Sequence, residues 1–186
     1  MAQNITLTPC LKHNANDLYC KFCGHVRELA QDINYYQLYG ITPPSFEVDQ
    51  DGLRKAYFDL QTLMHPDNFI GKSHKVQMAA MHNSSVINQG YTTLSNEFLR
   101  ARYLVELHLP PALAESKLDQ EFMIDAMELH EKISAANADV GALTHEVAQI
   151  KNKLWDDFKG FAQEHQWQDA SNVLDKLNII NKLSIS

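Results

Sequence analysis

The chain has 186 residues, of which 45% are hydrophobic and 21% are charged, and its formal net charge is −7. This is the composition of a globular protein with one domain or two small ones. The acidic excess lies in residues 109–186, which hold 7 basic and 13 acidic side chains. That balance argues against nucleic acid as a partner, because phosphate binding needs clustered cations. It fits a protein partner, or an acidic face that is simply solvated.

The sequence shows no targeting or membrane segment. No apolar run approaches the roughly 18 residues that a membrane span requires. The first twenty residues contain one lysine and no arginine, so neither a secretory nor a transit signal is indicated. We therefore expect a cytoplasmic protein, or one of the mitochondrial matrix if the source is eukaryotic.

Residues 1–33 contain all three cysteines and few large apolar side chains, so they need a staple to fold by themselves. The paired spacing of Cys10-x2-His13 and Cys20-x2-Cys23 is that of a small tetrahedral zinc site. His25 competes with His13 as the fourth ligand, as does a group from a partner. The alternatives are a disordered tail with incidental cysteines and a redox-active CxxC pair. We favour structural zinc.

Residues 34–108 are predicted to be helical. A short helix opens at Tyr35 and ends at Gly40, and Asp49 or Asp51 can cap the next one. That helix has a core stripe and ends before Pro66. The stripe consists of Leu53, Tyr57, Leu60 and Met64. Two further helices should follow.

The first of these two helices is expected over residues 75–94 and the second over residues 98–107. The first should make its contacts through Met78, Met81, Ser85, Asn88 and Tyr91. The second should make its contacts through Ala101, Leu104 and Val105.

His65-Pro66-Asp67 lies between two predicted helices. The bare tripeptide would be only a proline that ends a helix beside a capping aspartate. However, Arg54, Phe58, Gln61 and His65 fall within ~60° of one another on the preceding helix, apart from its core stripe. A cation and a bulky side chain thus precede the histidine on one exposed face. This arrangement favours a docking edge, and no nucleophile or second acid suggests catalysis.

Pro110-Pro111 marks the predicted domain boundary after His108. Beyond it, helical runs at 119–136, 142–165 and 167–184 with short loops predict an antiparallel three-helix bundle. The second run carries Val147, Ile150, Leu154, Phe158 and Phe161. The third run carries Ala170, Val173, Leu174, Leu177 and Ile180.

The helix at 119–136 has two apolar stripes. Phe122, Ala126, Leu129 and Ile133 form the first stripe. Met123, Ile124 and Met127 form the second, rotated roughly 100–120° away, with Glu128 and Glu131 on the same side. A helix packed between two neighbours would bury both stripes. The alternative is that the second stripe binds a partner, since methionine suits adaptable interfaces.

At this point a family resemblance is evident. Residues 34–108 resemble a J-domain through Tyr36-x-Leu38, His65-Pro66-Asp67-Asn68-Phe69 and Ile87-Asn88-Gln89-Gly90-Tyr91-x-Thr93-Leu94. Arg100-Ala-Arg-Tyr103-Leu104-Val-Glu-Leu107 and the following helices are similar to HscB, the J-protein of iron–sulfur cluster assembly. The resemblance covers residues 34–186. It implies an all-α fold with a J-domain hairpin and short flanking helices, then a three-helix bundle, preceded by the cysteine and histidine knuckle.

The resemblance also implies a function and its residues. The protein would stimulate the ATPase of a DnaK/HscA-type chaperone and deliver the scaffold protein IscU to it, without an active site or an iron–sulfur cluster of its own. The implied chaperone-binding residues are His65, Pro66, Asp67, Arg54, Lys55, Phe58 and Gln61. The implied scaffold-binding residues are Met123, Ile124, Met127, Glu128, Glu131 and Ile179.

The sequence departs from the family pattern at a few positions. Asn68 stands where lysine is usual, and Arg54 and Lys55 are the only cations on the helix before the motif. Weaker electrostatic steering is expected. Ile179 replaces a large aromatic residue, and a histidine replaces one cysteine of the family's four-cysteine zinc module. A general J-protein for unfolded clients and a metal- or redox-dependent protein centred on the cysteines are the alternatives.

Overall fold

The computed structural model describes residues 18–183 except 21–23, 31, 111–112, 114–117 and 136–138. Throughout these residues the regular structure is helical, and the backbone pairing outside helices is an isolated bridge between Tyr19 and Val26. The expected all-α fold is therefore confirmed. None of the described helices combines the length and the apolar character that crossing a bilayer requires. The chain divides into two compact units, residues 1–96 and 97–186.

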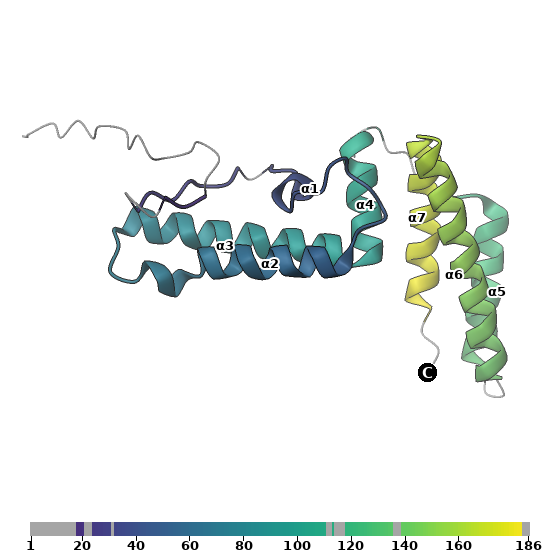
Figure 1. Cartoon of the computed structure of the whole chain (residues 1–186). Helices are drawn as coiled ribbons and strands as arrows, with labels where there is room; N and C mark the ends of the chain where they lie inside the picture. Colours follow the sequence, from purple (N-terminus) through teal and green to yellow (C-terminus); the bar gives the residue numbers. More distant parts are fainter. Residues whose placement is uncertain are drawn as a thin grey trace, which may run out of the picture. The chain divides into compact units, whose positions relative to one another are not determined.

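The first unit is built on a long helical hairpin (Figure 1). Its elements are α1 (Tyr35–Leu38), α2 (Gln50–Met64), the 3-10 helix η1 (Pro66–Phe69) and α3 (His74–Ser95). The carboxylate of Asp49 caps α2 by accepting from the N–H of Asp51, as one of the two predicted caps. The helix ends at Met64, because Pro66 cannot continue it.

The core face of α3 differs from the predicted one. The buried residues of α3 are Ala79, Ala80, Asn83, Val86, Ile87, Gly90 and Leu94. Met78, Met81 and Ser85 are exposed, so the expected contact stripe was wrong at these three positions, whereas the exposed Asn88 does contact α2 by accepting from Tyr57 and Gln61. The packed face of α3 thus mixes small and aliphatic residues, whereas the long side chains of Met78 and Met81 are exposed. Tyr91 does make a contact, since its ring stacks on Tyr57 at 4.2 Å.

Gly90 marks the closest approach in this unit. A Cβ atom at this position would lie 3.0 Å from Cε2 of Tyr39 and 3.1 Å from Cδ1 of Tyr35. Tyr39 is itself fixed, because it is buried and its hydroxyl donates to the carbonyl oxygen of Ile87. The glycine therefore serves the packing of α1 on α3, although glycine in the middle of a helix is unfavourable by itself.

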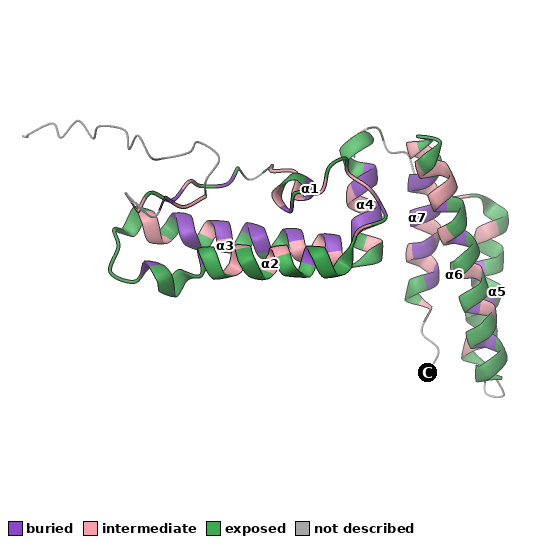
Figure 2. Cartoon of the chain, viewed as in Figure 1, coloured by how far each residue is buried: buried purple, intermediate pink, exposed green. Residues whose placement is uncertain are grey.

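The second unit contains α4 (Glu97–His108), α5 (Gln120–Ser134), α6 (Val140–Gln163) and α7 (Trp167–Lys182). Figure 2 shows the buried faces of these helices in purple. All five residues predicted for the core of the last helix are buried. In α6, Val147, Leu154 and Phe158 are buried, whereas Ile150 and Phe161 are half-buried. The three predicted bundle helices are present, each with both ends within two residues of the expected positions.

The helix α4 packs on α7 within this unit. The guanidinium of Arg102 donates to the carboxylate of Asp175 at 3.1 Å, and the rings of His108 and Trp167 stack at 4.0 Å. The expected boundary after His108 differs from the division into compact units, which falls after Asn96. The proline pair marks the end of a helix, while side-chain packing joins that helix to the bundle.

Candidate functional site

The His-Pro-Asp turn lies at the tip of the first unit's hairpin, directly after α2. His65 is the C-cap of α2 and also caps η1, because its Nδ1 atom accepts from the N–H of Asp67 at 3.3 Å. The same nitrogen lies 3.6 Å from Oδ2 of Asp67. Both side chains are exposed to solvent. The turn therefore displays an imidazole and a carboxylate in a fixed relation to each other.

The turn is held in place by the two residues after Asp67. Phe69 is buried in the hairpin core. The side-chain amide of Asn68 donates to the carbonyl oxygen of Thr62 at 2.7 Å and so ties η1 to the last turn of α2. Asn68, at the position where the family usually has lysine, therefore stabilises the turn. Periodicity could not have indicated it, because Asn68 lies outside the predicted helices.

The face of α2 behind the turn is only partly a display surface. Arg54, Lys55 and Phe58 are exposed, and the Phe58 side chain is 58% accessible. Gln61, expected on the same edge, instead bridges to α3, with its Nε2 atom 2.6 Å from Oδ1 of Asn88. The oxygen of Gln61 also accepts from the hydroxyl of Ser84 at 3.3 Å. Three of the four predicted docking positions on α2 are thus open to a partner, and Gln61 is occupied within the hairpin.

Two apolar residues beside the turn were not predicted as site residues. Ile70 follows η1 with 77% of its surface accessible, and Leu63 precedes the turn and is also exposed. Exposed apolar side chains mark an interaction surface where they form a contiguous patch, and these two lie close in sequence on either side of the displayed turn. The sequence does show these two aliphatic residues on either side of the tripeptide. They were not predicted because the prediction considered only one face of the preceding helix.

The two stripes of α5 have different environments. In the first stripe Ala126 and Leu129 are buried, and Phe122 and Ile133 are half-buried. In the second stripe Met123, Ile124 and Met127 are exposed, and Met127 is 63% accessible. The arrangement in which a helix between two neighbours buries both stripes therefore does not occur. The second stripe is free to meet a partner.

Part of the second stripe lines a groove with α7. Met123, Met127 and Glu131 of α5 and Ile179 of α7 bound a space of about 380 Å³ with an almost entirely apolar lining. The structure thus brings together four of the six residues implied for scaffold binding. Ile124 and Glu128 lie on the same exposed helix outside the groove. Four further lining residues were not predicted, and these are Ala126, His130, Lys182 and Leu183.

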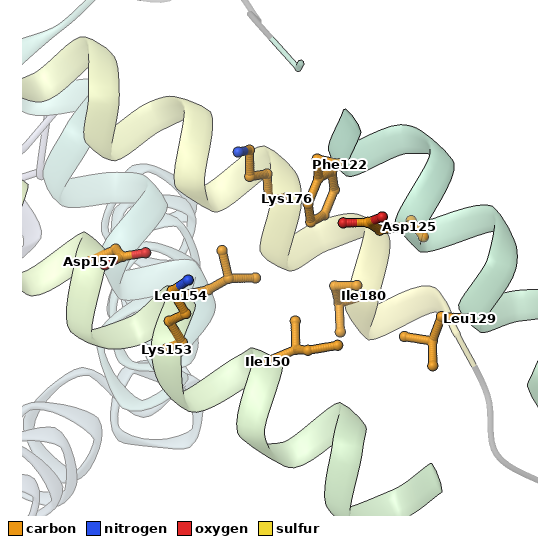
Figure 3. Close-up of a pocket in the computed structure, with 10 residues that line it drawn as sticks. Phe122, Asp125, Leu129, Ile150, Lys153, Leu154, Asp157, Lys176 and Ile180 are labelled. Carbon is orange, nitrogen blue, oxygen red and sulfur yellow. The ribbon is translucent and has the colours of Figure 1, made fainter. Parts of the chain in front are cut away.

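A second cavity lies behind α5, among α5, α6 and α7 (Figure 3). It has a volume of about 250 Å³, and its lining combines aliphatic side chains with two lysines and two aspartates. Lys176 lies 5.0 Å from the Phe122 ring centroid and donates to Oδ2 of Asp119 at 2.6 Å. That hydrogen bond, with one from the N–H of Phe122, lowers the pKa of the Asp119 carboxyl below its usual value. The inner face of α5 is therefore incompletely packed but anchored at its N-terminus.

The predicted zinc ligands fall mostly outside the described residues. Cys10, His13 and Cys23 are not among them, while Cys20 is described and buried. The N–H of Cys20 donates to the carbonyl oxygen of His25 at 2.9 Å, and the N–H of Gly24 donates to the carbonyl oxygen of Cys20 at 2.7 Å. These two bonds hold the backbone of Gly24 and His25 beside that of Cys20. Within the described chain, no three His, Cys, Asp or Glu side chains are grouped as metal ligands.

Comparison with known proteins gives a consistent match. Residues 118–186 match the family model described as the HSCB C-terminal oligomerisation domain. The chain is 31% identical over 162 residues to a co-chaperone protein HscB homolog from Pseudoalteromonas atlantica, covering 81% of this chain and 92% of that protein.

Solved structures show the same likeness. The structure of human co-chaperone protein HscB matches with a TM-score of 0.80 and 24% identity, over 93% of this chain and 89% of that chain. Chaperone HscB from Vibrio cholerae matches with a TM-score of 0.71 and 29% identity, over 81% and 93% respectively. With a bacterial relative matched over nearly its whole length and an all-helical fold shared with both structures, the chain belongs to the HscB co-chaperone family.

Proposed function

We propose that this protein stimulates the ATPase of a DnaK/HscA-type chaperone and delivers an IscU-type scaffold protein to it for iron–sulfur cluster assembly and transfer. The observation that carries the proposal is the display of two separate surfaces in a member of the HscB family. One is the exposed His65–Asp67 turn on the first unit. The other is the apolar groove beside the exposed Met127 on the second unit.

The chaperone contact would use the turn and the exposed part of α2. His65 and Asp67 offer polar groups in a fixed arrangement, Ile70 adds exposed apolar area just after them, and Phe58 adds it on α2. Arg54 and Lys55 supply the positive charge of α2. A ligand shifts a conformational equilibrium only through its differential affinity for the two states. We therefore infer that the turn binds best to the hydrolysis-competent form of the chaperone.

The scaffold contact would use α5 and the end of α7. The methionines can repack against a partner surface, and Glu128 and Glu131 at the same helix face select a partner with basic residues. Lys182 and His130 at the groove edge add a polar rim. An apolar centre with a polar rim is the usual anatomy of a protein–protein interface.

The deciding experiment is a steady-state ATPase assay of a DnaK/HscA-type chaperone. The rate is measured with the chaperone alone, with this protein, with an IscU-type scaffold, and with both. We expect this protein to raise the rate and the scaffold to raise it further. A rate that this protein leaves unchanged, at concentrations well above those of the chaperone, would refute the proposal.

A general J-protein for unfolded clients is the second candidate, and the exposed methionine stripe of α5 is also compatible with it. The two candidates differ in what occupies the groove. Under the second candidate an unfolded model client should bind and a folded IscU-type scaffold should not displace it, whereas under the first the scaffold should bind and the unfolded client should not.

We also propose that the N-terminal knuckle holds a structural zinc ion through Cys10, His13, Cys20 and Cys23. Of the four proposed ligands, only Cys20 lies in the part of the chain that the structure describes. Cys20 is buried, and Gly24, which follows Cys23, has a positive φ of 69° that lets the chain turn back after the pair. Metal analysis and thiol titration test the proposal. A metal-free protein with Cys10, Cys20 and Cys23 fully reactive would contradict it and would return attention to a redox role.

We propose a cytoplasmic location, because a DnaK/HscA-type partner would meet the protein there in a bacterium. Cell fractionation tests this.

A further inference from the structure

The N-terminal segment is anchored to α3 by a buried asparagine. Asn83 has 0% of its surface accessible. Its Oδ1 atom accepts from the N–H of Leu29 at 2.8 Å, and its Nδ2 atom donates to the carbonyl oxygen of Arg27 at 2.7 Å. The ring of His82 adds a hydrogen bond to the carbonyl oxygen of Leu29 at 2.9 Å. The backbone of Arg27 and Leu29 is therefore hydrogen-bonded to α3.

A short backbone pairing connects Tyr19 to these anchored residues. Tyr19 and Val26 form an antiparallel bridge, and the N–H of Arg27 donates to the carbonyl oxygen of Leu18 at 2.9 Å. Val26 and Leu29 are buried, so the segment that contains the bridge is also attached to the first unit by apolar contacts. In Figure 1 the purple segment that contains these residues runs along α3. Tyr19 is thus placed by α3 rather than by its neighbours in sequence.

Tyr19 in turn packs against the His-Pro-Asp turn. Its ring meets the ring of Phe69 edge-on, with centroids 5.6 Å apart and an interplanar angle of 83°. Phe69 is the last residue of η1, and Asp67 stands two residues before it. The two rings also line a recess of about 320 Å³ beside the turn. Its other lining residues are Asp59, Thr62, Leu63 and Asn68.

We infer that Tyr19 is a positioning residue for the His-Pro-Asp turn. The residues that hold Tyr19 in place, Val26, Arg27 and Leu29, therefore contribute to chaperone docking. η1 is only four residues long, so its orientation depends on how Phe69 is seated. An edge-to-face aromatic pair supports that seat from outside the hairpin. The inference deepens the proposed function and rests on it where ATPase stimulation is the readout.

The test compares Tyr19→Ala, Tyr19→Phe and a matched control, Tyr103→Ala, in the full chain. Tyr103 is a half-exposed tyrosine on α4, in the other compact unit. For Tyr19→Ala we expect the half-saturating concentration in the chaperone ATPase assay to rise by roughly 2- to 10-fold, the worth of one aromatic contact. Tyr19→Phe keeps the ring and should behave as wild type, as should Tyr103→Ala.

A second readout does not depend on the chaperone. In amide NMR spectra of the full chain, Tyr19→Ala should shift the resonances of Asp67, Asn68 and Ile70, and Tyr103→Ala should leave them in place. A Tyr19→Ala protein with unchanged resonances at these residues and unchanged half-saturation would overturn the inference. If the wild-type protein fails to stimulate any DnaK/HscA-type chaperone, the proposed function fails, while the resonance shifts still decide whether Tyr19 positions the turn.

Discussion

The Nδ1 atom of His65 accepts a hydrogen bond from the backbone N–H of Asp67 at 3.3 Å. The histidine therefore shapes the backbone that presents the aspartate, in addition to being exposed itself. Substituting either residue would alter the turn as well as remove a side chain. The two residues are best regarded as one recognition unit, whose parts cannot be expected to contribute additively.

We predict that His65→Gln abolishes stimulation of the chaperone ATPase and leaves helical content unchanged. The histidine lies after the last residue of α2 and is exposed, so its replacement removes no core contact. Steady-state ATPase rates and far-UV circular dichroism measure the two effects. His145→Gln, an exposed histidine on α6, is the matched control and should stimulate normally. Persistent stimulation by His65→Gln would mean that the chaperone docks elsewhere.

The double substitution Met127→Ala with Glu128→Ala should weaken binding of an IscU-type scaffold by roughly 10- to 100-fold, as truncation at the centre of an interface does. Both side chains are exposed on α5, so the fold should not change. Isothermal titration calorimetry gives the affinity. Met81→Ala removes a methionine of similar exposure, 54% accessible, from the other unit and should bind like wild type. Equal affinities for both variants would remove α5 from the interface.

Two glycine substitutions should have opposite effects on stability. Gly90→Ala places a methyl group about 3 Å from the rings of Tyr35 and Tyr39, and we expect it to lower the free energy of unfolding by about 1–3 kcal/mol. Gly160→Ala, inside α6 with nothing near the added atom, should raise the free energy of unfolding by about 0.5–1 kcal/mol. Urea unfolding followed by circular dichroism measures both. A stabilised Gly90→Ala protein would show that α1 sits farther from α3.

The carboxyl of Asp119 should make the second unit less stable in acid. Hydrogen bonds from Lys176 and from the N–H of Phe122 lower its pKa in the folded protein. Its contribution is therefore complete above the pKa of the unfolded chain and is lost as pH falls through the lower, folded value. Asp119→Asn keeps an N-cap acceptor for α5 but loses the charge.

Thermal melts from neutral to acidic pH should show a smaller loss of stability for Asp119→Asn than for wild type. Asp156→Asn, an exposed aspartate on α6, is the control and should follow wild type. Identical pH profiles for all three proteins would leave the Lys176 bond without an energetic role.

Much of the fold was readable from the sequence, because helix ends and stripes are local features. Pro66 and Asp49 mark the bounds of α2 as predicted, and every predicted core residue of α7 is buried. Membership of the HscB family is confirmed, and with it the expectation of a co-chaperone without an active site of its own.

Local sequence patterns could not predict which helix faces pack together or which residues far apart in the sequence form hydrogen bonds. The face of α3 that packs is set by its neighbours, and it excludes Met78 and Met81, which are exposed. The bond from Gln61 to Asn88 joins positions 27 residues apart, and the bond from Asn83 to Leu29 joins positions 54 apart. The exposed second stripe of α5 was one of two arrangements that periodicity allowed, and only the placement of α6 and α7 decided between them.

The incomplete packing behind α5 has a consequence for its local stability. Of the four helices in its unit, α5 has the fewest buried residues, Ala126 and Leu129, whereas α7 has six. A helix attached by so little apolar surface, with a cavity at its back, should open more readily than its neighbours, and its amide hydrogens should exchange sooner. Partner binding at the exposed face of α5 would then be coupled to the local opening equilibrium of this helix, because the partner binds the closed form. A bound partner would be detected first as slowed hydrogen exchange along α5.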